Sequence, residues 1–289
     1  MRTVNDFYDY ELIDAVNGER LERWGNIFLI RPDPQIIWTG ERIAPQWKTP
    51  NAIYHRSNSG GGHWENIKNV PDSWQVSYNG LTFCLKPMSF KHTGLFPEQA
   101  VNWKLAEELI RGANRPVSVL NLFAYTGAAT VACLKAGADV THVDASKGMV
   151  NWAKENACLS GVSDRNVRWL VDDCLKFVNR EIRRKKKYDA IIMDPPSYGR
   201  GPNGEVWKIE NKLSELLTCC SQILSEKPLF FFLNTYTTGF SPTILNYLVK
   251  ECFPVASDDK LFTDEIGLNV TARDISLPCG STTIWIKNG

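Results

Sequence analysis

Several acidic residues in this chain follow short apolar runs, which is where a parallel sheet presents side chains to a ligand. They are Asp144 after Val140–Val143, Asp172 and Asp173 after Asn166–Val171, and Asp194 after Tyr188–Met193. Carboxylates accept hydrogen bonds from hydroxyl and amino groups. The ribose and base of a nucleoside carry both kinds of group, so the pattern favours a nucleoside ligand.

A turn of small residues, Ala124–Gly127, lies between the apolar run Val117–Phe123 and an alanine-rich segment. Small side chains let the backbone approach a ligand closely. Asp144 follows Gly127 by 17 residues, near the spacing of the ribose-binding acid in a nucleoside-binding βαβ unit. Dinucleotide sites use three glycines to wrap a pyrophosphate, and this turn has only Gly127. We therefore favour a smaller cofactor, S-adenosylmethionine (SAM), over NAD and a nucleoside-dependent oxidoreductase.

The acids at the two later strand ends have different predicted partners. Asp172 or Asp173 is placed to accept from the adenine amino group, although an N-cap of the following helix is an equally good reading for one of them. Asp194 is followed by Pro195 and Pro196, which fix the backbone and remove two donors. This rigid acceptor corner suits an incoming amine or ring; the alternative is a strand exit stiffened by proline. If SAM is the cofactor, the reaction is methyl transfer from its sulfonium. This is an in-line displacement that depends mostly on positioning of the acceptor, which a rigid corner can provide.

The elements that hold these residues alternate between strand and helix from residue 91 to residue 289. Five βα units are followed by two strand-like runs, Leu268–Leu277 and Thr282–Lys287, joined by the short segment Pro278–Ser281. So short a connection requires antiparallel pairing. The order predicts an α/β fold with a doubly wound, mostly parallel seven-stranded sheet and a terminal antiparallel hairpin.

Residues 1–90 read as a separate small β-rich region with a substrate-binding role. It contains a hairpin signal at Asn79-Gly80 and an apolar pair of runs around a proline-rich turn, Gly25–Gly40. Six of the ten tryptophans occur by residue 103. Two readings stay open for them: stacking on a substrate, or packing within the sheet, which is the commoner use of tryptophan.

Composition excludes several classes of protein. The chain has 33 Lys and Arg against 32 Asp and Glu, so no global charge indicates a polyanionic partner. A local basic run, Arg180–Lys187, could contact RNA phosphates or could be the solvated end of a helix. No apolar stretch has membrane-spanning length and no secretory signal is visible, so we expect a cytoplasmic protein without a membrane partner. The eight cysteines show no metal-ligand spacing, and no metal is expected.

The motifs NLFAYTG, HVDAS, VDD and DPPSYG, in this order, resemble the Rossmann-like SAM-dependent methyltransferases. HTGLFPEQAVNW and DPPSYGRGPNGEVWK more narrowly resemble bacterial relatives of the large-subunit ribosomal RNA cytosine-C5 methyltransferases. The resemblance covers residues 85–289 well. It implies that the SAM-binding residues are Phe96, Gln99, Asn121, Phe123, Ala124, Tyr125, Thr126, Gly127, Asp144, Ala145, Ser146, Asp172, Asp173 and Asp194.

One feature departs from the cytosine-C5 pattern. That reaction needs a cysteine thiolate, which in the related enzymes follows the fourth or fifth strand. Here those positions read Pro195–Tyr198 and Leu233–Tyr236, without cysteine. The sequence therefore favours methylation of RNA, ribosomal RNA above all, at a nitrogen or oxygen, with Asp194, Pro195, Pro196 and the stacking ring of Tyr198 as catalytic residues. The alternatives are a cytosine-C5 RNA methyltransferase, or a SAM-binding scaffold without turnover; the oligomeric state is left open.

Overall fold

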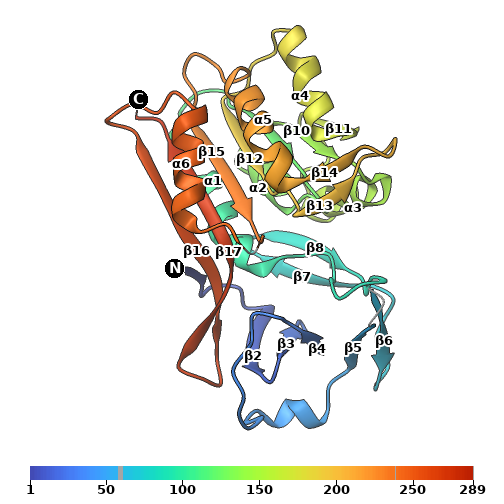
Figure 1. Cartoon of the computed structure of the whole chain (residues 1–289). Helices are drawn as coiled ribbons and strands as arrows, with labels where there is room; N and C mark the ends of the chain where they lie inside the picture. Colours follow the sequence, from blue (N-terminus) through green and yellow to red (C-terminus); the bar gives the residue numbers. More distant parts are fainter. Residues whose placement is uncertain (58–60, 238, 289) are drawn as a thin grey trace. The chain divides into compact units, whose positions relative to one another are not determined.

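The apolar runs that end in carboxylates form neighbouring parallel strands in the computed structural model (Figure 1). The strands of this part are β9 (Ser118–Leu122), β10 (Asp139–Asp144), β11 (Val167–Val171), β12 (Ala190–Met193), β15 (Phe230–Thr235), β16 (Lys260–Val270) and β17 (Ile275–Ile286). They lie in the order β11-β10-β9-β12-β15-β17-β16. The first five are mutually parallel, and β17 is antiparallel to β15. The predicted α/β class is confirmed, and the sheet is mixed.

The closing strands differ from the sequence prediction. The connection between β16 and β17 comprises residues 271–274, whereas the predicted turn, Pro278–Ser281, lies inside β17. Gly280 explains the error: a Cβ there would stand 2.8 Å from the carbonyl oxygen of Thr235. The glycine therefore permits a close approach of two strands and does not form a turn.

The structure describes residues 1–57, 61–237 and 239–288, and the chain divides into two compact units. Unit 1 comprises Met1–Val101 and Ile266–Cys279, and unit 2 comprises Asn102–Glu265 and Gly280–Gly289. The sequence prediction placed the boundary at residue 90 and gave 266–279 to the second domain. This segment joins unit 1 because β16 pairs there with two N-terminal strands, so the sheet is also larger than the predicted seven strands.

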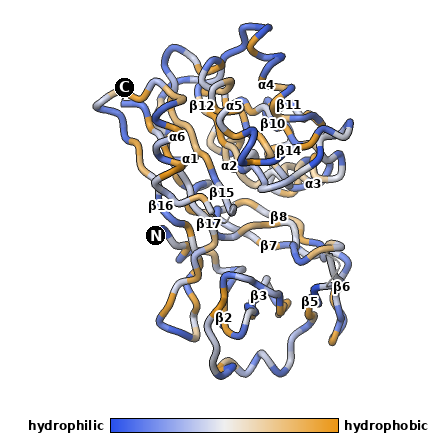
Figure 2. Tube along the Cα trace, viewed as in Figure 1, coloured by the Kyte–Doolittle hydropathy of each residue, from blue (hydrophilic) through white to orange (hydrophobic). Residues whose placement is uncertain are grey.

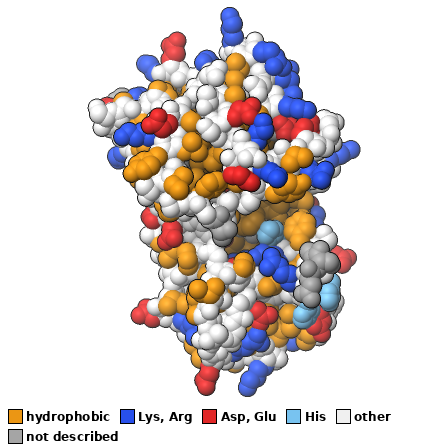
Figure 3. Space-filling view, in the orientation of Figure 1, with side chains coloured by type: hydrophobic (Ala, Val, Ile, Leu, Met, Phe, Trp, Pro, Cys, Tyr) orange, Lys and Arg blue, Asp and Glu red, His pale blue; other side chains and the backbone are white. Residues whose placement is uncertain are grey.

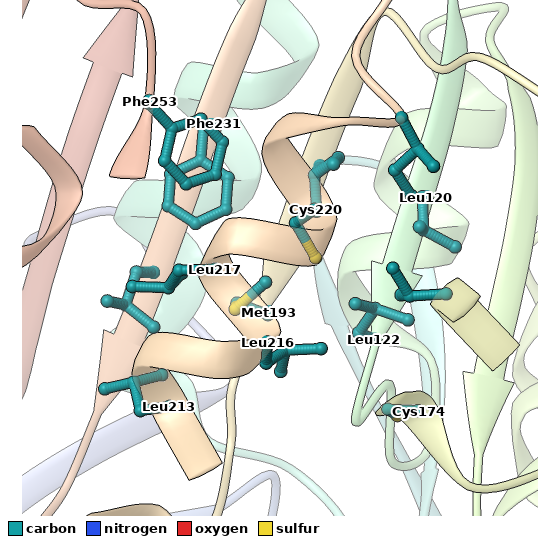
Figure 4. Close-up of a cluster of buried hydrophobic side chains, with 14 of the residues drawn as sticks. Leu120, Leu122, Cys174, Met193, Leu213, Leu216, Leu217, Cys220, Phe231 and Phe253 are labelled. Carbon is teal, nitrogen blue, oxygen red and sulfur yellow. The ribbon is translucent and has the colours of Figure 1, made fainter. Parts of the chain in front are cut away.

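Helices cover both faces of the sheet in unit 2 (Figure 1). They are α1 (Ala100–Gly112), α2 (Ala128–Lys135), α3 (Lys147–Leu159), α4 (Cys174–Arg183), α5 (Ile209–Ser221) and α6 (Pro242–Cys252). Side chains of α4, α5 and α6 form one buried apolar cluster with the sheet. In Figure 4, Leu216 of α5 lies beside Met193 and Leu122 of the strands. Apolar side chains on alternate strand positions thus fix which face each helix covers.

Unit 1 is built mainly from antiparallel pairs of strands. They are β1 (Arg2–Val4), β2 (Tyr10–Val16), β3 (Glu19–Trp24), β4 (Ile27–Pro32), β5 (Ala52–Arg56), β6 (Gly62–Asn66), β7 (Trp74–Tyr78) and β8 (Leu81–Leu85), with short 3-10 turns at Pro45–Lys48 and Pro97–Gln99. Asn79 and Gly80 join β7 to β8 with φ of 47° and 69°. Both values are positive, as a tight type I′ turn requires, so the predicted hairpin is confirmed.

Most of the early tryptophans pack within unit 1. Trp24 and Trp47 are buried, and the Trp47 indole donates a 2.7 Å hydrogen bond to the buried carboxylate of Asp14. The second apolar run of Gly25–Gly40 does not become a strand: residues 35–38 form none, and Ile37 is 87% exposed. The proline-rich turn before them removes a backbone donor that a ladder would need. Among the described residues, no helix is long and apolar enough to cross a membrane.

Candidate active site

The loops that carry the predicted site residues meet at one edge of the sheet in unit 2. Leu122 is in register with Val143 of β10 and with Met193 of β12, and Asp144 is in register with Val171 of β11. Because these strands are parallel, their carboxyl ends lie side by side. The loops after them therefore bring Asp144, Asp172 and Asp194 to a common edge, which is where open α/β sheets bind ligands.

The loop after β9 has an unusual backbone. Phe123, Tyr125 and Gly127 have φ of 53°, 50° and 80°. For the two residues with side chains, this left-handed conformation costs about 1–2 kcal/mol each. The loop is held by bonds from the Ala124 amide to the Val143 carbonyl (3.1 Å) and from the Phe123 amide to Cys174 Sγ (3.3 Å). Strain that is held in place in this way is typical of a ligand-binding loop, and sequence patterns carry no signal for it.

Gly127 ends this loop where no larger residue fits. A Cβ at this position would lie 2.7 Å from the Cβ of Ala153 in α3. The missing side chain allows α3 to pack directly against the loop, in addition to permitting the positive φ. Two structural requirements, the positive φ and the close packing of α3, therefore explain the single glycine of the turn.

We expect Gly127→Ala to lower the free energy of unfolding by about 2–4 kcal/mol, the sum of left-handed strain and a steric clash. SAM affinity should fall as well, because the loop must shift. Gly137→Ala is the matched control: its φ is +99°, and nothing lies within 4 Å of the added Cβ. Thermal unfolding and calorimetric SAM titration of both variants separate the two effects. Equal stability losses with unchanged SAM binding would contradict the steric argument.

Asp144 fastens the loop and retains capacity for a ligand. Its Oδ2 accepts from the Tyr125 amide and its Oδ1 from the Ser146 amide, each at 2.8 Å. Burial raises the pKa of the Asp144 carboxyl, and these two amides partly offset that rise. A carboxylate has about four lone-pair sites. Two remain for donors such as the paired hydroxyls of a ribose, so the geometry fits the nucleoside part of SAM.

Ala145 and Ser146 continue from Asp144 into α3. The Ser146 side chain caps this helix by accepting from the Met149 amide, and the Ala145 side chain is small and half-buried. Thr126 on the facing loop is anchored by its carbonyl, which accepts from Asn156 Nδ2 of α3 at 2.8 Å. The two loops are thus tied to the same helix.

Three buried polar side chains, those of Asn121, Thr130 and His142, form a hydrogen-bonded row next to the loop. The family resemblance implied that Asn121 binds SAM. Asn121 is 4% exposed, and its Nδ2 donates to Thr130 Oγ1 of α2 at 3.0 Å. Thr130 Oγ1 in turn lies 3.0 Å from His142 Nδ1. Burial lowers the pKa of His142 to about 3, so this imidazole is neutral. The amide of Asn121 supports the loop from below.

The two acids after β11 have separate structural roles. Asp173 is the N-cap of α4 and accepts from the Lys176 amide at 2.9 Å. Asp172 forms an ion pair with Arg180 in the second turn of α4. Asp173 therefore has the N-cap role that the sequence predicted as an alternative for one of the two acids. Asp172 also accepts from the Asp173 amide at 2.9 Å, so both acids have protein partners, and which of them contacts adenine stays a prediction.

The corner after β12 is braced by a tryptophan that sequence analysis did not single out. Trp207 Nε1 donates to the Pro196 carbonyl at 2.6 Å, and its ring lies 4.9 Å from that of Phe123. Residues 199–208 are polar and rich in glycine, a composition that favours a loop, but they contain β14 (Val206–Lys208), which pairs with β13 (Tyr198–Arg200). An Asn203-Gly204 pair lies between the strands, the same signal that identified the hairpin at residue 79.

Tyr198 and Asp194 both belong to this braced corner. The Tyr198 side chain is 53% exposed, Asp194 is half-buried, and the Asp194 amide bonds the Leu122 carbonyl of β9 at 3.4 Å. Phe96 and Gln99 belong to unit 1, where the Phe96 ring contacts His92. Their contact with SAM, and that of the other site residues, stays a prediction. Across the described residues, no cluster of three His, Cys, Asp or Glu could hold a metal ion.

Residues 44–227 match the S-adenosylmethionine-dependent methyltransferase family, and the chain belongs to that family. It is similar to the SAM-dependent methyltransferase of Agrobacterium tumefaciens, with 34% identity over 99% of this chain and 93% of that one and a TM-score of 0.94. A methyltransferase solved in complex with S-adenosylhomocysteine shares the fold, with 20% identity over 98% of this chain and 76% of that chain and a TM-score of 0.75.

The curated relatives are longer proteins. The ribosomal RNA large subunit methyltransferase K/L of Shewanella frigidimarina is 35% identical over 157 residues, which is 54% of this chain and 21% of the relative. The chain thus matches about a fifth of that protein's length. The chain is therefore a member of the SAM-dependent methyltransferase family with a Rossmann-like α/β fold, and SAM is the methyl donor of that family.

Proposed function

We propose that this methyltransferase modifies RNA, with ribosomal RNA favoured, at a nitrogen or oxygen atom and without a cysteine nucleophile. The observation that carries the proposal is the braced corner Asp194–Tyr198. It offers a carboxylate, fixed carbonyls and an exposed aromatic ring beside the cofactor loop, and no thiol. Bound SAM supplies an electrophilic methyl group, so an amine or hydroxyl that is held in line with it needs no covalent intermediate.

The corner can orient such an acceptor. Pro195 and Pro196 hold the backbone in one conformation, and Trp207 fixes the Pro196 carbonyl. The Asp194 carboxylate can accept from an amino group and stabilise the positive charge that develops as the methyl group arrives. The exposed Tyr198 ring provides a stacking surface for an unpaired base, a common means of recognising RNA.

Three cysteines of unit 2, Cys174, Cys219 and Cys220, do not favour the cytosine-C5 alternative. Cys174 is the thiol that contacts the cofactor loop, and there its Sγ accepts from the Phe123 amide. Burial raises the pKa of Cys174 and of Cys220 well above the ordinary value. Nucleophilic cysteines need the opposite shift, toward the thiolate. Cys219 of α5 is half-buried, and its partial burial also raises the pKa of its thiol.

RNA as the substrate is supported by the relatives, which are named as ribosomal RNA methyltransferases. The segment that matches this chain is only a minor part of each relative. RNA is therefore proposed as the substrate of this chain and is not carried over from the relatives as a finding. We also propose that the chain is a bacterial relative of the ribosomal RNA cytosine-C5 methyltransferases, because the motifs HTGLFPEQAVNW and DPPSYGRGPNGEVWK resemble theirs. We further propose that the β-rich unit 1 helps to hold the substrate, and that the protein acts in the cytoplasm.

The test compares methylated nucleosides by mass spectrometry in ribosomal RNA from cells with and without the gene. One N- or O-methylated nucleoside should disappear without the gene and return with the wild-type copy, but not with an Asp194→Asn copy. Loss of 5-methylcytidine would establish the cysteine-dependent alternative. Full restoration by the variant would favour a SAM-binding scaffold, and an unchanged RNA profile would redirect the search to protein or small-molecule acceptors.

A further inference from the structure

The charge of this nearly neutral chain is unevenly distributed. Residues 165–187 contain nine Lys and Arg but only three Asp and Glu, a net charge of +6 where the whole chain has +1. Five of the nine form one uninterrupted run, Arg183–Lys187, at the end of α4; we call this run the basic cap. Figure 2 shows the end of α4 as hydrophilic, and Figure 3 shows Lys and Arg side chains gathered over it at the upper right.

Most of this charge is not neutralised by neighbouring carboxylates. Glu181 is the buried acid of the region, and it is shared between Arg184 (2.9 Å) and Arg168 (3.5 Å). Within the described part of the chain, Arg183, Lys185 and Lys186 form no ion pair, and all three are exposed. The basic cap therefore presents several solvated cations close together, an arrangement whose mutual repulsion opposes folding.

The backbone of the basic cap contains a second unfavourable feature. The Lys185 amide bonds the Ile182 carbonyl and the Lys186 amide bonds the Glu181 carbonyl, each at 3.0 Å. This pair of bonds is the Schellman motif that ends many helices, and its left-handed residue is usually glycine. Here that residue is Lys185, with φ of 54°. A cation thus occupies the one position of the turn where a side chain is disfavoured.

Helix termination alone does not account for the basic cap. The negative end of a helix dipole corresponds to about half an elementary charge, which one or two cations complement. Five cations in succession exceed that need, and a glycine at residue 185 would end the helix with less strain. Both features lower stability, and contact with an anionic partner would make use of both of them.

The position of the basic cap indicates which part of a substrate it would meet. The helix α4 starts at Cys174, directly after the carboxyl edge with Asp172, and its ten residues span about 15 Å. The chain then enters β12 at its amino end, whereas Asp194 follows the carboxyl end of the same strand. The basic cap therefore lies at the edge of the sheet opposite the methyl-transfer corner.

We propose that the basic cap is a secondary anchor for the phosphate backbone of the RNA substrate, away from the nucleotide that is methylated. The proposal rests on the proposed RNA substrate. Arg183 offers a planar fork for phosphate oxygens and the lysines offer point charges. Contacts of this kind add affinity without reading sequence, and their strength falls steeply with salt.

The test uses the full chain with Arg183→Gln, Lys185→Gly and Lys186→Gln combined. A matched control neutralises three other exposed lysines of unit 2: Lys227→Gln, Lys250→Gln and Lys260→Gln. Binding of poly(U) and of ribosomal RNA from cells lacking the gene is measured by fluorescence anisotropy across a KCl series. At about 0.1 M salt the basic-cap variant should bind about 10- to 100-fold more weakly, with a salt slope reduced by about two. The control should resemble the wild type.

Two further measurements exclude a folding defect. Lys185→Gly alone should raise Tm by about 1–3 °C, because it relieves the left-handed strain, and still weaken RNA binding. In methylation assays the triple variant should raise KM for RNA and leave kcat and SAM affinity unchanged. A triple variant with wild-type RNA affinity and salt slope would overturn the anchor while leaving RNA methylation intact. A wild-type protein that neither binds nor methylates RNA would overturn the proposed function itself.

Discussion

Replacing Asp194 by asparagine should reduce the rate of methyl transfer by about 10²- to 10⁴-fold, the range expected when a positioned catalytic group is lost. The carboxylate accepts from the incoming amine and stabilises its developing positive charge, whereas the substituted amide presents two donors and no charge. The corner itself should persist, because the prolines and the bond from Trp207 to Pro196 remain. The loss should therefore appear in kcat, with little change in Tm.

The measurement is turnover of RNA from cells lacking the gene at saturating SAM, together with Tm for each variant. Asp139→Asn is a suitable control, since Asp139 is an exposed aspartate at the amino end of β10, remote from the carboxyl edge. If Asp194→Asn retained wild-type turnover, Asp194 would have no catalytic role. A large loss of Tm would instead identify Asp194 as a structural residue.

Asp144→Asn should weaken SAM binding by about 100-fold, as expected for the loss of charge-assisted hydrogen bonds. The substitution removes the charge that the ribose hydroxyls would meet. It also sets an amide NH₂ against one of two backbone donors, the amides of Tyr125 and Ser146. The strained loop would then lose one of its fastenings. Calorimetric titration with SAM measures the effect, and Asp139→Asn again provides the control from the same strand.

The pH dependence of SAM binding should report the same carboxylate. Burial raises the pKa of Asp144, so in the free protein the native state holds this proton more tightly than the unfolded chain does. Its contribution to stability is therefore greatest below the unfolded-state pKa and declines as pH rises through the raised pKa. SAM affinity should rise over that same window, since the ionised form is the better acceptor. Asp144→Asn should lack this step, and a wild-type affinity independent of pH across it would contradict the assignment.

Local patterns were enough to predict the parallel βα part of the fold and the edge of the sheet where the candidate site residues meet. The turn Ala124–Gly127 and the carboxylates Asp144 and Asp194 follow the carboxyl ends of parallel strands, which lie at one edge of the sheet. The Asn79-Gly80 hairpin was equally predictable, because the requirement for positive φ at two successive residues is local. Apolar alternation and turn chemistry act within a few residues, so a single sequence displays them.

The tertiary structure decided everything that depends on partners distant in the chain. It gave residues 266–279 to unit 1 through pairing with β1 and β2, and placed Gly280 within a strand because the backbone of Thr235 lies so close. It also distinguished the roles of two adjacent acids: Asp173 caps α4, and Asp172 forms an ion pair with Arg180. It also showed the left-handed Lys185 that ends α4. The sequence alone determined the α/β class of the fold and the edge of the sheet where the candidate site residues meet, because these follow from local periodicity. Contacts and backbone strain are set by long-range packing, which no local pattern encodes.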